Sequence, residues 1–250
     1  KVDSLNYQQQ LGFVGREPRW AVAYKFPSVQ GITKLIGIGV NVGRTGSLNP
    51  YAILEPVQVG GVTIRHAALH NEEDIRRKDI RIGDFVIIQR AGEVIPEVVG
   101  PVLNRRTGEE REFSLPGRCP ECDTTVVRPE GEAMAYCPNR ACPAQGYELL
   151  KHFVSRGAMD IEGIGESLCA ALLEQGLVKD AADIYALTPE QLESLDRMGK
   201  KSAGNVIEAI QRSRTRPLAN IVFALGIRHV GAETAALLVE HFGSLDAIAA

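Results

Sequence analysis

Four of the five cysteines lie close together in the middle of the chain, as Cys119-x2-Cys122-x14-Cys137-x4-Cys142. Two close pairs of thiols joined by a short loop can place four sulfur atoms at the corners of a tetrahedron, the geometry that Zn²⁺ takes in closed structural sites. Prolines and a glycine beside these pairs suit the tight turns of a zinc-binding loop. The spacing therefore predicts a zinc site. Because four sulfurs leave no open position for a substrate, the predicted role of the metal is structural.

Two disulfide bonds are the alternative for these cysteines. We find nothing in the sequence that resembles a secretory signal peptide, and the fifth cysteine, Cys169, stands alone in a helical pattern. Both features favour a reducing compartment, where thiols persist and disulfides are rare. The zinc interpretation is therefore preferred.

A second chemical pattern recurs in the last hundred residues, where an apolar residue and a glycine precede a helical pattern at Gly165, Gly199 and Gly231. Glycine at a helix start leaves the backbone N–H groups uncovered and makes a site that can hold a phosphate without reading bases. Lys200 and Arg228 add positive charge beside two of these turns. The pattern predicts binding to the backbone of duplex DNA. A purely structural helical solenoid is the alternative, although tetratricopeptide and ankyrin signatures are absent.

Arg44 is a further candidate for DNA contact. It lies in a glycine-flanked turn, and a surface arginine is by default merely solvated. Arg65, Arg90 and the run 76–78 are weaker candidates of the same kind, and phosphate contact through them would be salt-dependent and indifferent to sequence. The net charge of −3 does not favour a nucleic-acid binder, so this interpretation depends on local features.

The elements that must position these residues follow from the hydrophobic pattern. Several short β-branched runs separated by turns, with one helix that starts at Asn71, fit a small closed barrel over about residues 30–104. Residues 105–112 are polar and are predicted to form a linker. From Tyr147 onward the apolar spacing becomes helical, and Thr188 is predicted to cap a helix. No apolar run approaches the length of a membrane span.

Several motifs in this order resemble those of one family, the bacterial NAD⁺-dependent DNA ligases. Lys1-Val2-Asp3-Ser4 and the segment 21–27, which contains Lys25, resemble the last two nucleotidyltransferase motifs of that family. The motifs Val42-Gly43-Arg44-Thr45-Gly46, Leu69-His70-Asn71 and Arg90-Ala91-Gly92-Glu93-Val94-Ile95-Pro96 resemble its oligonucleotide-binding (OB) barrel. The four cysteines and the repeated glycine turns then follow in the family's order, so the resemblance covers essentially the whole chain.

The resemblance implies a multidomain fold: an all-β OB-fold barrel, a small four-Cys zinc finger and an all-α tandem helix-hairpin-helix domain. We predict the end of the nucleotidyltransferase (adenylation) domain over residues 1–28 and the OB-fold domain over 29–104. The zinc finger is predicted over 105–145, and a C-terminally truncated helix-hairpin-helix domain over 146–250.

The resemblance also implies an activity. In that family a lysine attacks NAD⁺ and carries AMP to the 5′-phosphate at a nick, and the 3′-hydroxyl then displaces AMP to seal the strand. By motif match, Lys1 and Lys25 would line the nucleotide pocket, where an ammonium offsets charge on the phosphate during phosphoryl transfer. A disordered terminal residue is the alternative for Lys1, and a charge at a strand edge is the alternative for Lys25. For Arg44 the resemblance implies a DNA contact, because barrels of this class bind nucleic acid through exposed loops and one sheet face. Catalytic Mg²⁺ or Mn²⁺ is also implied, but its ligands cannot be identified in this sequence.

The sequence departs from the family pattern in several places. The nucleophilic lysine of the family's Lys-x-Asp-Gly motif has no counterpart and is expected upstream, as is the domain that recognises nicotinamide mononucleotide. The fourth hairpin turn and the C-terminal module are also missing. We therefore expect this chain alone to bind nicked double-stranded DNA but to form no AMP adduct. The resemblance further implies a monomer in the bacterial cytoplasm, associated with the nucleoid through DNA and not with membranes.

Two other classes of protein remain open at this stage. One is a non-catalytic DNA clamp that uses the barrel, the finger and the hairpins without nucleotide chemistry. The other is a repair nuclease or a helicase accessory protein, which would need carboxylates arranged around Mg²⁺. The acids are scattered, and the cluster Glu72-Glu73-Asp74 is better interpreted as a helix start.

Overall fold

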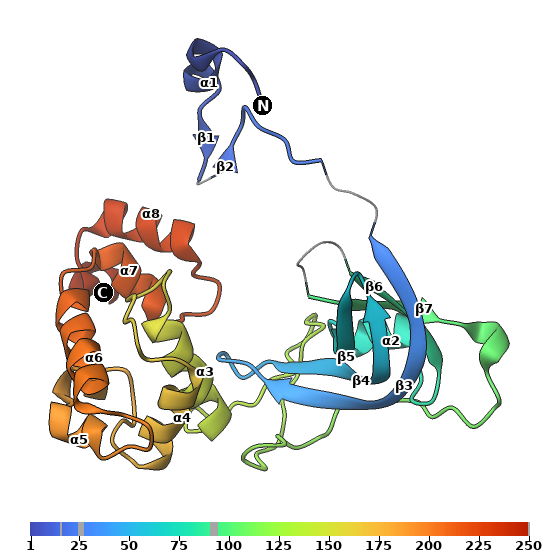
Figure 1. Cartoon of the computed structure of the whole chain (residues 1–250). Helices are drawn as coiled ribbons and strands as arrows, with labels where there is room; N and C mark the ends of the chain where they lie inside the picture. Colours follow the sequence, from blue (N-terminus) through green and yellow to red (C-terminus); the bar gives the residue numbers. More distant parts are fainter. Residues whose placement is uncertain (16, 25–27, 91–94, 250) are drawn as a thin grey trace. The chain divides into compact units, whose positions relative to one another are not determined.

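The computed structural model describes residues 1–15, 17–24, 28–90 and 95–249 (Figure 1). These residues divide into two compact units. The first contains Lys1–Gly39 and Pro50–Ser114, and the second contains Val40–Asn49 and Leu115–Ala250. The tip of one long hairpin, Val40–Asn49, therefore belongs to a different unit from the rest of that hairpin.

The first unit opens with a short segment that buries none of its large apolar side chains. Helix α1 (Leu5–Leu11) is followed by the short strands β1 (Phe13–Val14) and β2 (Glu17–Pro18), which pair antiparallel. Ser4 caps α1, since its side chain accepts a hydrogen bond from the Tyr7 backbone N–H. No residue of α1 is buried, and Phe13 is also exposed. This segment lacks an apolar core of its own in the described part of the chain.

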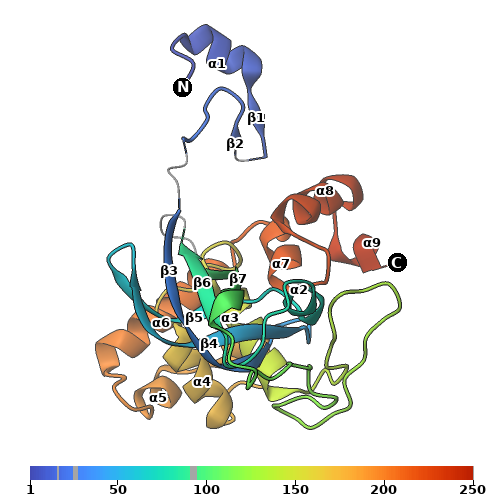
Figure 2. The same ribbon diagram turned by 90° about the vertical axis from the view of Figure 1, so that its right-hand side faces the viewer.

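The rest of the first unit is a closed barrel, in the order β3-β4-β5-β7-β6. Its strands are β3 (Val29–Val42), β4 (Leu48–Val59), β5 (Val62–Ala68), β6 (Phe85–Arg90) and β7 (Glu97–Pro101). Strand β3 is the long curved ribbon seen in both views (Figures 1 and 2). Antiparallel pairing links most neighbours, and one parallel pair, Ala68 with Glu97, closes the barrel. The predicted barrel is confirmed.

Alternating side chains fill the barrel interior. The fully or almost fully buried core residues are Leu35, Ala52, Leu54, Val59, Ile64, Val86, Ile88 and Val98. Helix α2 (Glu72–Arg77) lies between β5 and β6 in the sequence and contributes Ile75 to the same core. The predicted cap at Asn71 is confirmed, because its Oδ1 accepts a hydrogen bond of 2.7 Å from the Asp74 N–H. The acidic residues in the first turn of α2 interact favourably with the positive end of the helix dipole.

One arginine anchors the segment that follows the barrel. After the short helix η1 (Leu103–Arg105), Arg106 donates from Nε to Asp84 Oδ1 at 2.7 Å and from Nη2 to Asp84 Oδ2 at 2.9 Å. The Asp84 side chain is fully buried. Arg106 also bonds Asp79 and holds the pKa of that carboxyl below its usual range. The start of the predicted linker is therefore fixed to the barrel in this structure.

The second unit is largely helical. Its helices are α3 (Pro143–Val154), α4 (Glu166–Glu174), η2 (Asp183–Ala186), α5 (Pro189–Glu193), α6 (Lys200–Ser213), α7 (Leu218–Ala224), α8 (Ala232–Phe242) and α9 (Leu245–Ala249). The last three follow one another in red tones in Figure 2. Their shared core includes Leu150, Phe153, Leu172, Ile184, Leu192, Val206 and Ile210. The predicted capping box at Thr188 is confirmed, with Gln191 as its partner.

Within the described residues, no helix has both the length and the apolar character needed to cross a membrane.

The Arg106–Asp84 pair generates a testable prediction. Replacing Arg106 with alanine leaves the buried Asp84 carboxylate without its charged partner, so the barrel should lose about 3 kcal/mol of unfolding free energy. The neighbouring Arg105, whose guanidinium lies 5.0 Å from the centre of the Phe85 ring, is the control. Its replacement with alanine should cost less than about 1 kcal/mol. Urea unfolding measures the loss of unfolding free energy in each variant, and hydrogen exchange of the β6 amides shows whether the loss is in the barrel. Equal losses would contradict this account.

Candidate metal centre and nucleic-acid interface

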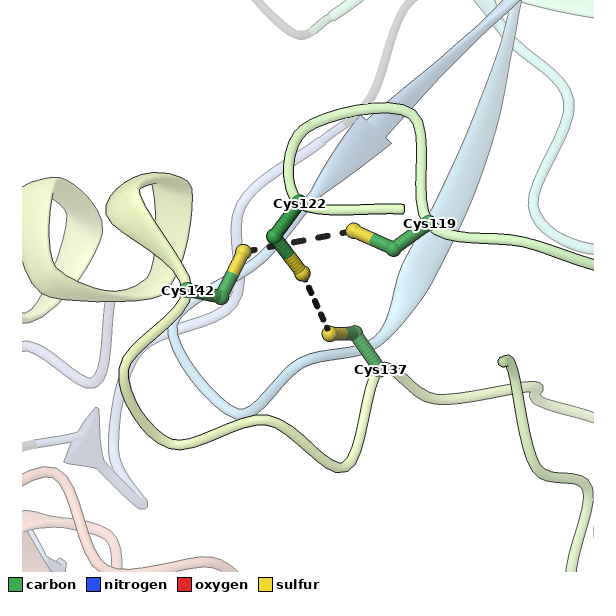
Figure 3. A group of neighbouring side chains, drawn as sticks. All are labelled: Cys119, Cys122, Cys137 and Cys142. Carbon is green, nitrogen blue, oxygen red and sulfur yellow. Dashed lines mark hydrogen bonds between the residues drawn. The ribbon is translucent and has the colours of Figure 1, made fainter. Parts of the chain in front are cut away.

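The structure brings the four predicted cysteines together (Figure 3). Their sulfur atoms all lie within 4.8 Å of one another, with 3.9 Å between Cys119 and Cys142 and 3.5 Å between Cys122 and Cys137. Tetrahedral Zn²⁺ with bonds of about 2.3 Å places its sulfur ligands roughly 3.8 Å apart. The cluster therefore has the ligand type, the number of ligands and the spacing of a structural zinc site. Cys169 lies apart, buried in the helical core.

Local backbone bonds hold each cysteine pair. In the first pair, the Cys119 N–H donates to the Thr124 carbonyl oxygen at 2.9 Å, and the Asp123 N–H returns to the Cys119 carbonyl at 3.0 Å. Asp123 has a positive φ of 56°, as a tight turn requires. In the second pair, Cys142 is the N-cap of α3, and its N–H donates to Asn139. Each half is thus a turn closed by its own hydrogen bonds.

The thiols of this cluster need a cation. Burial raises the pKa of Cys137 to about 12 and also raises the pKa of Cys142, whereas the neighbouring Thr124 hydroxyl lowers the pKa of Cys122 to about 6. Zinc binds thiolates, so its charge would offset the cost of ionising Cys137 and Cys142. The residues present fit Zn²⁺ and would supply a closed site with no catalytic position.

The three predicted glycine turns share one geometry. Gly165, Gly199 and Gly231 are the N-caps of α4, α6 and α8. Their φ values are −88°, −87° and −86°, and their ψ values are −176°, 164° and 179°, so all three have extended backbone. No described atom outside the neighbouring residues lies within 4 Å of the position that a Cβ would take at any of them. The helix starts are confirmed. Anion binding by their N–H groups stays a prediction.

The basic residues near these turns differ in how free they are. Lys200 is the first residue of α6 and is exposed. Arg228 instead forms an ion pair with Glu132, donates to the Tyr136 hydroxyl at 2.9 Å and stacks 4.4 Å from the centre of the Tyr136 ring. The Tyr136 hydroxyl, together with Arg228, holds the pKa of Glu132 below its usual range. Arg228 thus links the α7–α8 turn to the loop of the cysteine module, a role that the sequence did not indicate.

Arg44 lies exposed in the turn between β3 and β4. Its Nη1 is 3.4 Å from Nδ1 of His152 on α3. The turn borders a cleft of about 480 Å³ that is also lined by Lys151, His152 and Ser155. Lys151 is paired with Glu148 and Glu166. Arg44, Lys151 and His152 therefore line one cleft.

The structure also shows where the weaker basic candidates of the barrel lie. Arg65 is exposed on β5, and Arg90 is partly buried at the end of β6. Arg77 and Lys78 both bind the Asp74 carboxylate, so the run 76–78 is largely neutralised by its own helix.

The predicted nucleotide-binding lysines are Lys1 and Lys25. Lys1 is exposed at the start of the chain. Lys25 lies outside the described residues. The role of both lysines stays a prediction.

The metal centre generates the second prediction. Replacing Cys137 with serine should abolish tight zinc binding, which falls from about one ion per chain to near zero, because serine does not supply a thiolate. Metal analysis of the purified protein measures this. Cys169→Ala is the matched control, since Cys169 is an equally buried thiol outside the cluster, and it should keep its zinc. Zinc retained by the Cys137 variant would refute the assignment.

Five family models match the chain in order. Residues 1–29 match the NAD-dependent DNA ligase adenylation domain, residues 32–110 its OB-fold domain and residues 118–144 its C4 zinc finger domain. Residues 156–212 match a SAM-like helix-hairpin-helix tandem, and residues 220–250 match a helix-hairpin-helix motif.

Curated relatives named DNA ligase align with nearly the whole chain. The Dehalococcoides mccartyi (strain CBDB1) protein is 59% identical and aligns with 100% of this chain and 38% of its own length. The Rubrobacter xylanophilus protein is 56% identical over 97% of this chain and 35% of its own length. The Bacillus subtilis (strain 168) protein is 52% identical over 98% of this chain and 37% of its own length. The chain thus spans less than two-fifths of these relatives, and it belongs to the family of NAD⁺-dependent DNA ligases.

Proposed function

We propose that this chain is the DNA-gripping portion of an NAD⁺-dependent DNA ligase that seals nicks between a 5′-phosphate and a 3′-hydroxyl in duplex DNA. The observation that carries the proposal is the set of open glycine N-caps, Gly165, Gly199 and Gly231, which repeat one backbone geometry. The same chain also contains an OB-fold barrel and a zinc finger. Such helix starts bind phosphates through main-chain N–H groups and do not read bases. A ligase in replication and repair needs that indifference, since nicks occur in any sequence.

The chemistry in this proposal is adenylyl transfer. A lysine outside this chain takes AMP from NAD⁺ and passes it to the 5′-phosphate, before the 3′-hydroxyl displaces it. Lys1 and Lys25 are proposed to neutralise the adenylate phosphate, because a nearby ammonium stabilises the charge that develops in phosphoryl transfer. Mg²⁺ or Mn²⁺ is proposed as the catalytic metal.

The DNA contacts in the proposal are the three glycine turns, Lys200 and Arg44. Arg228 is proposed as a contact that would exchange Glu132 for a phosphate, since the two anions compete for one guanidinium. The partner is nicked double-stranded DNA bound by a monomer, which would place the protein at the nucleoid in the bacterial cytoplasm. Neutralising phosphates releases counterions, so the affinity should fall steeply as salt is added.

The glycine turns can be tested without disturbing the helix. Asp and Asn are both good N-caps, so Gly199→Asp and Gly199→Asn should leave α6 folded. The carboxylate of Asp would occupy the phosphate position and repel a phosphate, so the aspartate variant should bind a nicked duplex about tenfold more weakly. The asparagine side chain is neutral, so that variant should change affinity much less. Fluorescence anisotropy with a labelled nicked duplex at fixed salt measures this. Equal affinity of the two variants would refute the anion site at Gly199.

A further prediction distinguishes DNA binding by this chain from the adenylation step. Incubation of this chain with NAD⁺ labelled in its adenylate should leave the protein unlabelled, because the sequence contains no Lys-x-Asp-Gly motif. Denaturing electrophoresis and autoradiography detect a lysyl-AMP adduct. A full-length relative provides the positive control. A labelled band from this chain alone would contradict the proposed division of roles.

A further inference from the structure

The turn that carries Arg44 pairs with the cysteine module through its main chain. We call residues 43–46 the arginine turn. The Cys137 N–H donates to the Gly46 carbonyl oxygen at 2.8 Å, and the Leu48 N–H donates to the Ala135 carbonyl oxygen at 2.8 Å. Between them, Ser47 and Tyr136 form an antiparallel bridge. A zinc ligand is therefore hydrogen-bonded directly to the arginine turn.

The contact at Gly46 is too close for any other residue. Gly46 is buried and has a positive φ of 81°, and a Cβ there would stand 2.4 Å from the Cys137 carbonyl oxygen. The side-chain amide of Gln145, which is 7% exposed, also binds that carbonyl and lies 3.0 Å from the same Cβ position. Its Nε2 donates to the carbonyl oxygens of Cys137 and Asn139, each at 3.0 Å. Gln145 therefore orients the peptide against which the arginine turn rests.

The Arg44 side chain is held separately, by His152. The Nε2 atom of His152 lies 2.8 Å from the Phe223 carbonyl oxygen, an acceptor, so Nε2 carries the proton. In a neutral ring Nδ1 is then free to accept from the Arg44 guanidinium, 3.4 Å away. The ring also meets the Phe223 ring edge-on at 4.7 Å. The orientation of the His152 ring is thus fixed by Phe223, independently of Arg44.

We propose that the zinc finger and α3 preorganise the arginine turn, with Gln145 and His152 as positioning residues that aim Arg44 at a DNA phosphate. The inference rests on the proposed function, in which Arg44 contacts DNA. Without these contacts, a glycine-flanked turn would sample many conformations, and DNA binding would have to order it. On this account the zinc finger contributes to DNA affinity through the arginine turn.

Gly46→Ala tests the main-chain contact. The added Cβ meets the Cys137 carbonyl, so the arginine turn should detach, amide exchange at Leu48 should accelerate by about tenfold or more, and nicked-duplex affinity should fall about tenfold. Gly61→Ala is the matched control, since Gly61 has nearly the same φ of 80° in another hairpin turn but no neighbour within 4 Å of a Cβ. It should leave both quantities within about twofold. Equal effects of the two variants would overturn the inference.

Gln145→Glu tests positioning without added bulk, because it replaces the donor with an acceptor of the same shape. Zinc content should stay at about one ion per chain. DNA affinity should fall about tenfold in the Arg44 background but less than about twofold in an Arg44→Ala background, because the two residues act through one contact. His152→Gln, which keeps one donor and one acceptor, should retain affinity, whereas His152→Leu should lose it. The same loss in both backgrounds would overturn the inference.

The two proposals fail in different ways. If Arg44→Ala leaves DNA affinity unchanged, Arg44 is not a DNA contact, and the inference falls with that part of the proposed function. If Arg44→Ala weakens binding but Gln145→Glu changes neither exchange at Leu48 nor affinity, the DNA contact stands and only the positioning role is overturned.

Discussion

The clustering of four thiols is the constraint on which the finger and the tip of the β3–β4 hairpin depend. The buried set around it is small: Val42, Leu48, Cys119, Cys137 and Cys142. A core of this size cannot fold a loop of irregular backbone by apolar burial alone, so metal binding must supply folding free energy. Val42 and Leu48 belong to the β3–β4 hairpin. The same constraint therefore orders the tip of that hairpin together with the finger.

Several cations of this chain are bound to carboxylates of the protein itself. Arg106 is bound to Asp84, Lys151 to Glu148, and Arg228 to Glu132. The proposed DNA binding relies instead on main-chain N–H groups at three helix starts, which need no net charge, so it is compatible with a net charge of −3. Lys200 is exposed beside one of those turns.

The features that could be predicted from the sequence are those encoded by residues close together in the chain. Asn71 and Thr188 were recognisable as caps because a cap is defined within four residues. The glycine turns were recognisable because the same short pattern occurs three times, and the cysteines because their spacing encodes ligand geometry. The barrel followed from alternating apolar residues. Gln145 and His152 gave no signal, since both are ordinary residues within a helical pattern, and the engagement of Arg228 with Glu132 joins positions that no local pattern connects.

The sequence by itself therefore determined the kinds of element, their order, the zinc ligands and the repeated glycine turns at helix starts. The tertiary structure alone decided that the hairpin tip pairs with the finger at Gly46 and Cys137, which are distant in sequence. It also decided that Arg228 and Arg106 are bound to carboxylates. The physical reason is that periodicity and spacing act over one turn or one strand. Which unpaired carbonyl or carboxylate a distant donor meets depends on how whole elements pack.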